Sequence, residues 1–399
     1  MGWPMRSLHR RRWLLTAAVL IPALITGLVM VRGAHGSAPR LPYVPATDDQ
    51  LLAELPLGVR HQTASVRALA STRLDIALPL AQFHIAQARS TGDLRQLGYA
   101  EAVLQPWLQQ APVPASVRVL TATIEQSRHD FGTALEQLDL ALQTDPDNVQ
   151  AWLTRATVLR VLGRYDQAQQ ACAHLAAQAD SVVTGLCEQS LRGLTGHLRE
   201  AYEAVQGLPQ QGLGIELRAW RYSELGEMAV RLGQDGAAEH WWREGLQLKP
   251  DDFFVRAAYA DLLLRQRRAA EAQALLSGHE SMEPMLLRIV LAEQILGNRR
   301  DANDRALLAS AFQVEEQRGE AVHRREQARF LLDVERAPAA SLVAAQQNWQ
   351  VQREPEDVLV LVRAAQAAGQ PEAAAPALEF VRQRGLEDAR LDALQKASP

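Results

Sequence analysis

Apolar residues recur at helical spacing along most of this chain. From Thr63 almost to the C-terminus, small and aliphatic residues repeat with the period of an amphipathic helix, and Gly, Pro and Asn signals interrupt them every dozen or so residues. The alternation of apolar and polar residues that marks a half-buried strand is hard to find. The pattern predicts an all-α protein with essentially no sheet.

An internal repeat organises these helices. Two neighbouring units align with a constant step of 34 residues, and two later units align with the same step. The first alignment matches Ala122 with Ala156, Phe131 with Tyr165, Ala134 with Ala168, Leu138 with Cys172, and Pro146 with Asp180. The second matches Gly226 with Ala260, Gly233 with Arg267, Ala238 with Ala272, and Trp242 with Leu276. This period is that of a two-helix repeat.

The residue types at these positions explain the period physically. Ala122 and Ala156 stand where the first helix of a unit would press closely on the second, and a large side chain there would force the helices apart. Phe131 and Tyr165 stand near the turn, where an aromatic ring would fill the space between units. Pro146 cannot continue a helix and so ends the second one. Each unit is therefore expected to be a closely packed helix pair.

The repeats divide the body of the chain into two predicted regions. Residues 63–286 form the repeat array, whose first unit turns at Thr91–Asp93. Residues 287–399 form degenerate C-terminal helical repeats, in which only small residues keep the pattern. We expect about eight helical pairs in all.

The repeat residues resemble the tetratricopeptide repeat family. One unit carries Trp152, Ala156, Gly163, Tyr165 and Ala168, and another carries Leu225, Gly226, Ala238 and Pro250. The resemblance implies a right-handed α-α superhelix, a tetratricopeptide-like solenoid whose inner face is lined by the first helix of each pair, helix A. That face commonly binds a peptide or a partner protein. The whole chain also resembles the membrane-tethered repeat proteins of bacterial envelopes.

The N-terminus reads as a targeting segment that precedes the fold. Residues 1–12 are basic, residues 13–31 are uncharged and long enough to span a bilayer, and the Pro-rich residues 32–62 resemble an extended tether. Four arginines precede the span and two follow it, so the repeats are expected on the periplasmic side of the inner membrane as a single-pass protein. The alternative is cleavage near Ala34–Gly36 and secretion to the periplasm.

Charge and composition exclude several functions. Six of the 42 basic side chains lie in residues 1–40, which hold no acid, so the rest carries 36 basic and 46 acidic side chains. This balance disfavours a nucleic-acid partner. The ten histidines are scattered singly, and we find no metal-ligand spacing, phosphate-binding glycine loop or nucleophile motif. We therefore predict no metal, no cofactor, no catalytic residue and no small-molecule substrate.

The two cysteines leave two interpretations open. Cys172 belongs to the second helix of one unit and Cys187 to the start of the next, so a disulfide could join adjacent units outside the cytoplasm. Alternatively, both are small buried thiols. No cysteine precedes Cys172 and none follows Cys187. The chain thus lacks the lipid-bearing cysteine of pilus-assembly repeat lipoproteins and the C-terminal Cys-x-x-Cys pair of lipopolysaccharide-assembly repeat proteins.

The resemblance also suggests which residues would line a peptide-binding groove. Trp220 and Phe254 take the second position of helix A, which tends to face the groove in that family. Later turns of the helix A segments place further residues on or near the same side: Thr157, Arg160, Glu227, Arg231, Asp261 and Arg265. A groove of mixed charge suits an extended peptide or a partner's helix. The alternative is a solvated helix face without a ligand.

These observations favour a non-enzymatic envelope adaptor or scaffold. It would bind a partner protein or peptide in the concave groove of the repeats, for example during assembly of a membrane complex. An alternative is an enzyme with its site in the irregular region 277–325, where His279, Glu280 and His323 occur. A purely structural, self-associating solenoid is the third interpretation.

Overall fold

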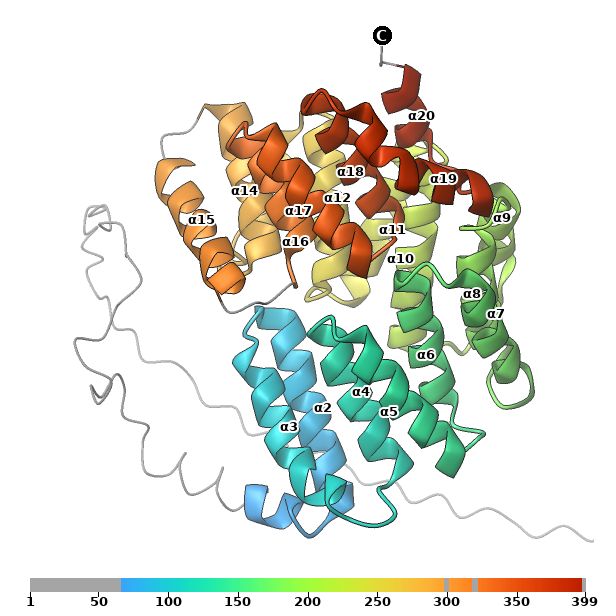
Figure 1. Cartoon of the computed structure of the whole chain (residues 1–399). Helices are drawn as coiled ribbons and strands as arrows, with labels where there is room; N and C mark the ends of the chain where they lie inside the picture. Colours follow the sequence, from blue (N-terminus) through green and yellow to red (C-terminus); the bar gives the residue numbers. More distant parts are fainter. Residues whose placement is uncertain (1–65, 298–300, 318–321, 397–399) are drawn as a thin grey trace, which may run out of the picture. The chain divides into compact units, whose positions relative to one another are not determined.

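The computed structural model describes residues 66–297, 301–317 and 322–396 (Figure 1). Within these ranges the regular structure is helical and contains no strand, so the predicted all-α fold is confirmed. The predicted basic segment, membrane segment and tether, residues 1–62, lie outside the described ranges. Across the part of the chain that the structure describes, no helix combines the length and apolar character needed to cross a bilayer.

The helices follow one another as antiparallel pairs, nine in the described residues against about eight predicted. The pairs are α2 (Leu74–Thr91) with α3 (Arg95–Leu108), α4 (Ala115–Ser127) with α5 (Phe131–Thr144), α6 (Val149–Val161) with α7 (Tyr165–Ala173), α8 (Ser181–Arg192) with α9 (Leu198–Gly207), α10 (Ile215–Arg231) with α11 (Asp235–Leu248), α12 (Phe253–Arg265) with α13 (Ala269–Leu276), α14 (Glu283–Leu296) with α15 (Asp301–Gln317), α16 (Arg324–Arg329) with α17 (Pro338–Val351), and α18 (Pro355–Ala367) with α19 (Ala375–Arg384).

Four further segments complete the helical part. The short helix η1 (His174–Ala177) follows α7, the π-helical turn η2 (Phe330–Val334) extends α16, and η3 (Pro371–Ala374) precedes α19. The chain then ends in α20 (Ala389–Lys396). Each pair also packs on the next, which is the stacking that a repeat solenoid requires (Figure 1).

A left-handed backbone residue closes the turn inside every described pair. These residues have φ between 56° and 81° and are Gly92, His129, Gly163, Gly196, Gly233, Arg267, Gly297, Arg336 and Gly369. The left-handed conformation reverses the chain directly after a helix, and glycine adopts it without a steric penalty. In three repeats a larger residue takes the same conformation, which shows that the turn geometry persists even where the glycine is missing.

The small residues of the repeat stand where the two helices of a pair approach closely. Ala122, Ala156 and Ala260 are almost completely buried. At Gly226 the approach is closest, because an added Cβ would lie 2.1 Å from Nε1 of Trp242. The predicted reason for small residues at these positions is therefore confirmed.

The C-terminal repeats pack back onto the third repeat, the pair α6 and α7. The Arg353 amide donates a hydrogen bond to the Val161 carbonyl at 2.8 Å, and the Tyr165 hydroxyl donates to the Arg353 carbonyl at 3.3 Å. The Tyr165 ring also lies 5.6 Å from that of Phe380. One apolar cluster accordingly combines residues of α6, α7 and α8 with residues of α16 to α20. Sequence repetition alone does not predict this long-range contact.

Candidate functional site

The predicted groove residues fall into two groups in the structure. Arg160, Arg231 and Asp261 are bonded to other parts of the chain, whereas Phe254 exposes 65% of its surface. Arg265 forms an exposed ion pair with Asp235 on the preceding repeat. The first group belongs to a set that we call the charge cluster. Its members are Arg160, Glu224, Glu227, Arg231, Asp261, Arg288, Arg325, Arg329, Glu354 and Asp357.

Arg160 joins α6 to two other segments. Its guanidinium lies 3.6 Å from a carboxylate oxygen of Glu224 on α10 and 3.9 Å from one of Glu354, the N-cap of α18. Trp220 donates its indole hydrogen bond to the same Glu224 at 3.0 Å. Burial alone would lower the pKa of Arg160, but the two carboxylates more than offset it and raise that pKa. The third repeat is thus tied electrostatically both to the fifth and to the C-terminal helices.

Asp261 is held between two arginines. Arg288 on α14 donates to it at 2.6 Å, and Arg329 on α16 donates to both of its oxygens at 2.7 and 3.0 Å. Burial by itself raises the pKa of Asp261, but the two guanidinium groups outweigh burial and hold that pKa well below its usual range. The carboxylate is therefore fully occupied within the chain.

Two further groove residues lie on α10. Arg231 is buried and donates a hydrogen bond to the Gly193 carbonyl at 2.7 Å. Glu227 has a pKa raised to about 7, because neighbouring segments partly desolvate its carboxylate and the carboxylate of Glu224 repels a second negative charge.

Thr157 completes the predicted set and is part-buried, with its hydroxyl donating to the Leu153 carbonyl at 3.0 Å. This is the usual local bond of a threonine within a helix. Among the described residues, no hydrogen bond joins this side chain to the ion pairs of Arg160 or of Asp261. Its predicted role in peptide binding stays a prediction.

The centre of the charge cluster is Arg325, which sequence analysis did not single out. It donates to Asp357 at 2.6 Å, to Glu354 at 2.8 Å and to the Gln352 side chain at 3.2 Å. Asp357 is completely buried and also closes a capping box with Glu354 at the start of α18. In sequence these charges resemble a solvated helix surface, so only the observed packing of α16 against α18 could reveal them.

The structure also locates the residues of the alternative enzyme site. His323 forms a 2.5 Å hydrogen bond with Glu315 on α15, whereas Glu280 accepts a hydrogen bond from the Gly278 amide. Within the described ranges, neither His279 nor Glu280 forms a hydrogen bond or ion pair with His323. Those ranges also contain no group of three or more side chains that could hold a metal ion.

The two cysteines form a disulfide in the structure. It links Cys172 on α7 to Cys187 on α8 with a Cα–Cα distance of 5.7 Å. Of the two interpretations of these cysteines, the structure therefore has the disulfide and not two free thiols. The bond fastens the third repeat to the fourth.

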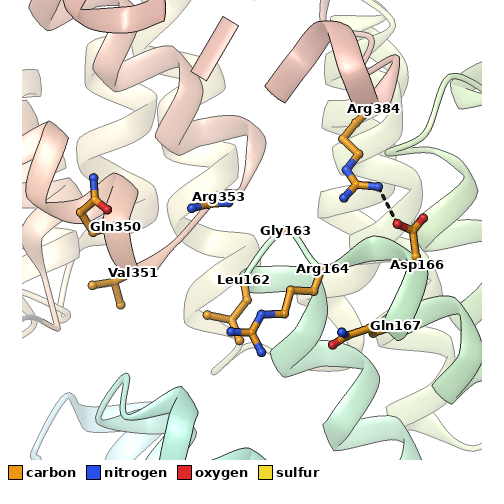
Figure 2. A pocket seen from close by; sticks show the side chains of 9 residues that line it. All are labelled: Leu162, Gly163, Arg164, Asp166, Gln167, Gln350, Val351, Arg353 and Arg384. Carbon is orange, nitrogen blue, oxygen red and sulfur yellow. Dashed lines mark hydrogen bonds and ion pairs between the residues drawn. The ribbon is translucent and has the colours of Figure 1, made fainter. Parts of the chain in front are cut away.

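A polar cavity of about 330 Å³ lies beside the turn of the third repeat. Figure 2 shows three arginines around it, each from a different segment: Arg164 before α7, Arg353 before α18 and Arg384 at the end of α19. Arg384 is paired with Asp166 at 2.9 Å, and Gln167 and Gln350 add amides to the wall (Figure 2). No residue of this cavity was predicted, because its parts are far apart in sequence.

Comparisons with known proteins found one similar curated protein and several similar solved structures. Among curated proteins, the human protein O-mannosyl-transferase TMTC2 is 33% identical over 93 residues, which is 22% of this chain but only 11% of that protein. The solved structure of PilW, a type IV pilus biogenesis factor, has 20% sequence identity and a TM-score of 0.39. The match covers 50% of this chain and 94% of the PilW chain.

Two other solved structures are similar to the same degree. Pseudomonas aeruginosa PilF is 18% identical, with a TM-score of 0.31, and covers 62% of this chain and 99% of that one. The Cut9–Hcn1 structure of the APC/C is 15% identical, with a TM-score of 0.40, and covers 77% of this chain and 52% of that one. Similarity at this level assigns no function.

A family model gives the more specific result. Residues 126–187, which include α5, α6, α7 and the disulfide, match the model described as "Tetratricopeptide repeat". The match falls on the two units whose sequences align at 34 residues, and the structure shows each unit as a helix pair closed by a left-handed turn. Residues 126–187 of this chain therefore carry tetratricopeptide repeats.

Proposed function

We propose that this protein is a non-enzymatic scaffold that holds a partner protein at a bacterial membrane. The observation that carries the proposal is the array of tetratricopeptide helix pairs, since such repeats generally bind protein partners. In this proposal residues 13–31 anchor the chain in the inner membrane, and the repeats lie on the periplasmic side. The protein does no chemistry itself.

The disulfide supports the proposed compartment. Disulfides persist in oxidising compartments such as the periplasm and are rare in the reducing cytosol. A bond between Cys172 and Cys187 therefore fits repeats that have been exported. The distribution of the N-terminal arginines also favours the periplasmic side for the repeats. A fusion of alkaline phosphatase after residue 62 tests this placement, because the phosphatase is active only when exported. An inactive fusion would contradict it.

Phe254 is the groove residue from which we expect the first partner contact. Its side chain is the most exposed large apolar one in the described residues, at 65%, and its ring lies 3.9 Å from that of Phe253. Exposed aromatic side chains on a rigid helix supply much of the binding energy of many interfaces. Arg160, Arg231 and Asp261 already have partners within the chain, so they can contribute only if those contacts break.

Site-specific photo-crosslinking in intact cells tests the proposed contact. A photoreactive residue at Phe254 should give one discrete adduct with another protein, identified by mass spectrometry. The matched control is Val343, which is also apolar and exposes 54% of its surface on α17. Equal labelling of the same protein from both positions would indicate non-specific proximity. An adduct with a second copy of this chain would instead favour the self-associating solenoid.

A further inference from the structure

The cavity beside the third repeat is positively charged in an otherwise acidic body. Its lining contains three arginines and one acid, Asp166, whereas the chain beyond residue 40 carries more acidic than basic side chains. Each of the three guanidinium groups comes from a different segment: the α6–α7 turn, the α17–α18 loop and the end of α19 (Figure 2). A field of one sign in a concave surface concentrates ligands of the opposite sign.

Two of these arginines are available to a ligand. Arg384 is paired with Asp166, whereas the side chains of Arg164 and Arg353 form no ion pair or side-chain hydrogen bond with the described residues. Arg164 is exposed, and the Arg353 guanidinium lies 5.7 Å from the ring centre of Trp349. Almost every other arginine near the C-terminal helices has a carboxylate partner, such as Arg325, Arg363 and Arg390. The cavity therefore holds unneutralised positive charge.

The walls of the cavity are fixed before any ligand arrives. The Arg353 backbone is bonded to the Val161 carbonyl and to the Tyr165 hydroxyl, so its position relative to α6 and α7 is set. Gly163 leaves no space for movement, because an added Cβ would lie 2.9 Å from the Phe380 ring and 3.1 Å from Cβ of Arg353. A preformed site loses less conformational entropy when it binds.

The backbone adds a weaker attraction of the same sign. α7 begins at Tyr165, beside the cavity, and its N-cap residue Arg164 makes no side-chain capping bond. The free N–H groups in the first turn of a helix point outward at its N-terminal end and favour an anion there. This end of α7 supplements the three arginines and does not by itself define the site.

We propose that this cavity binds a pair of carboxylate side chains from an acidic segment of a partner polypeptide. The proposal rests on the proposed scaffold function and specifies the chemistry of the partner. Arginine and carboxylate match geometrically, since two parallel N–H groups can donate to two oxygens. With Asp166 counted, the lining carries a net charge of two, which two carboxylates would neutralise. The cavity size is at the lower end of ligand sites and accommodates side chains better than a whole helix.

Fluorescence anisotropy with the full-length chain in detergent tests this proposal. The probes are two labelled Gly-Ser peptides, amidated at the C-terminus, with either two adjacent Glu or two adjacent Gln at the centre. We expect the Glu peptide to bind at least about tenfold more tightly than the Gln peptide, and more weakly as salt is added. Arg164→Gln should weaken binding of the Glu peptide about tenfold, because one charged hydrogen-bonding group is lost. Arg353→Gln should act similarly.

The matched control is Arg192→Gln, since Arg192 is exposed on α8, forms no side-chain hydrogen bond or ion pair with the described residues, and does not line the cavity. It should leave peptide binding unchanged. Equal affinity for the Glu and Gln peptides, or equal losses from Arg164→Gln and Arg192→Gln, would overturn the proposal. So would displacement by inorganic phosphate at the peptide's own concentration, which would assign the cavity to a free anion. The scaffold function is judged separately, by the Phe254 crosslink, so the two can fail independently.

Discussion

Replacing Gly226 by alanine isolates the close helix approach on which each repeat depends. The new Cβ would lie 2.1 Å from Nε1 of Trp242, whereas an ordinary contact begins at 3.4 Å, so the indole must retreat by about 1.3 Å. Trp242 exposes only 2% of its surface and packs in an apolar cluster that extends from the fourth repeat to the seventh, so it has little room to move. The substitution therefore overpacks a buried interface.

Two opposing effects decide the magnitude. Alanine favours a helix interior over glycine by about 1 kcal/mol. Overpacking a core costs about 1–3 kcal/mol, and a displacement of this size belongs at the upper end. We therefore expect Gly226→Ala to destabilise the fold by about 2 kcal/mol, measured as a lower midpoint of urea unfolding. Gly98→Ala is the control, since nothing lies within 4 Å of its added Cβ in α3, and it should stabilise by up to about 1 kcal/mol.

The next repeat supplies the compensating pair. Ala260 and Leu276 stand one period after Gly226 and Trp242, and both are fully buried. The double variant Gly226→Ala/Trp242→Leu copies that pair, so Gly226→Ala should cost less in the Trp242→Leu background than in the wild type. If Gly226→Ala proves as stable as the wild type, or if its cost is the same in both backgrounds, close contact with the indole is not the reason for the glycine.

Three further predictions concern a turn, a histidine and the disulfide. Arg267→Gly should raise the unfolding free energy by about 1 kcal/mol, because Arg267 is exposed at φ 62° where glycine is unstrained; a lower urea midpoint would refute the strain argument. Burial opposes protonation of His323, but its bond to Glu315 raises the pKa to about 9, above the ordinary 6.5. The resulting stability is fully present below pH 6.5 and is lost as the pH rises through 9. Wild type should therefore exceed Glu315→Gln by up to about 3 kcal/mol at pH 6 and by little at pH 10, in urea titrations at both values. Replacing Cys172 and Cys187 by alanine opens a link between residues 15 apart and should cost about 3 kcal/mol; unchanged melting after reduction would show that the link is not formed in solution.

Local features of the fold could be predicted from the sequence because each is set within one repeat. The 34-residue step placed Tyr165 correctly as a buried ring beside the turn, and Pro146 lies just after the end of α5, as expected of a residue that cannot continue a helix. The first unit also turns at Gly92, between α2 and α3, as predicted. These positions depend on neighbours a few residues or one period away.

The charge cluster and the arginine cavity could not be predicted in this way. Arg160 was placed on a groove-facing side, but its partner Glu354 lies in repeats that had lost their recognisable pattern. Whether a charged helix residue faces water or another helix depends on which distant segments pack together, and one sequence carries no signal of such pairing. For the same reason, Arg353 could not be assigned to the cavity beside Arg164.

The contact between Tyr165 and Arg353 also affects how the chain is synthesised and folds. A simple solenoid completes each repeat as soon as the next one emerges, since contacts join only neighbours. Here the Tyr165 hydroxyl cannot form its hydrogen bond until Arg353, 188 residues further along the chain, has been synthesised. At ribosomal rates of about 5–20 residues per second, that interval is roughly ten to forty seconds. During this time the third repeat exposes to solvent the apolar surface that the C-terminal helices of the chain cover in the folded protein.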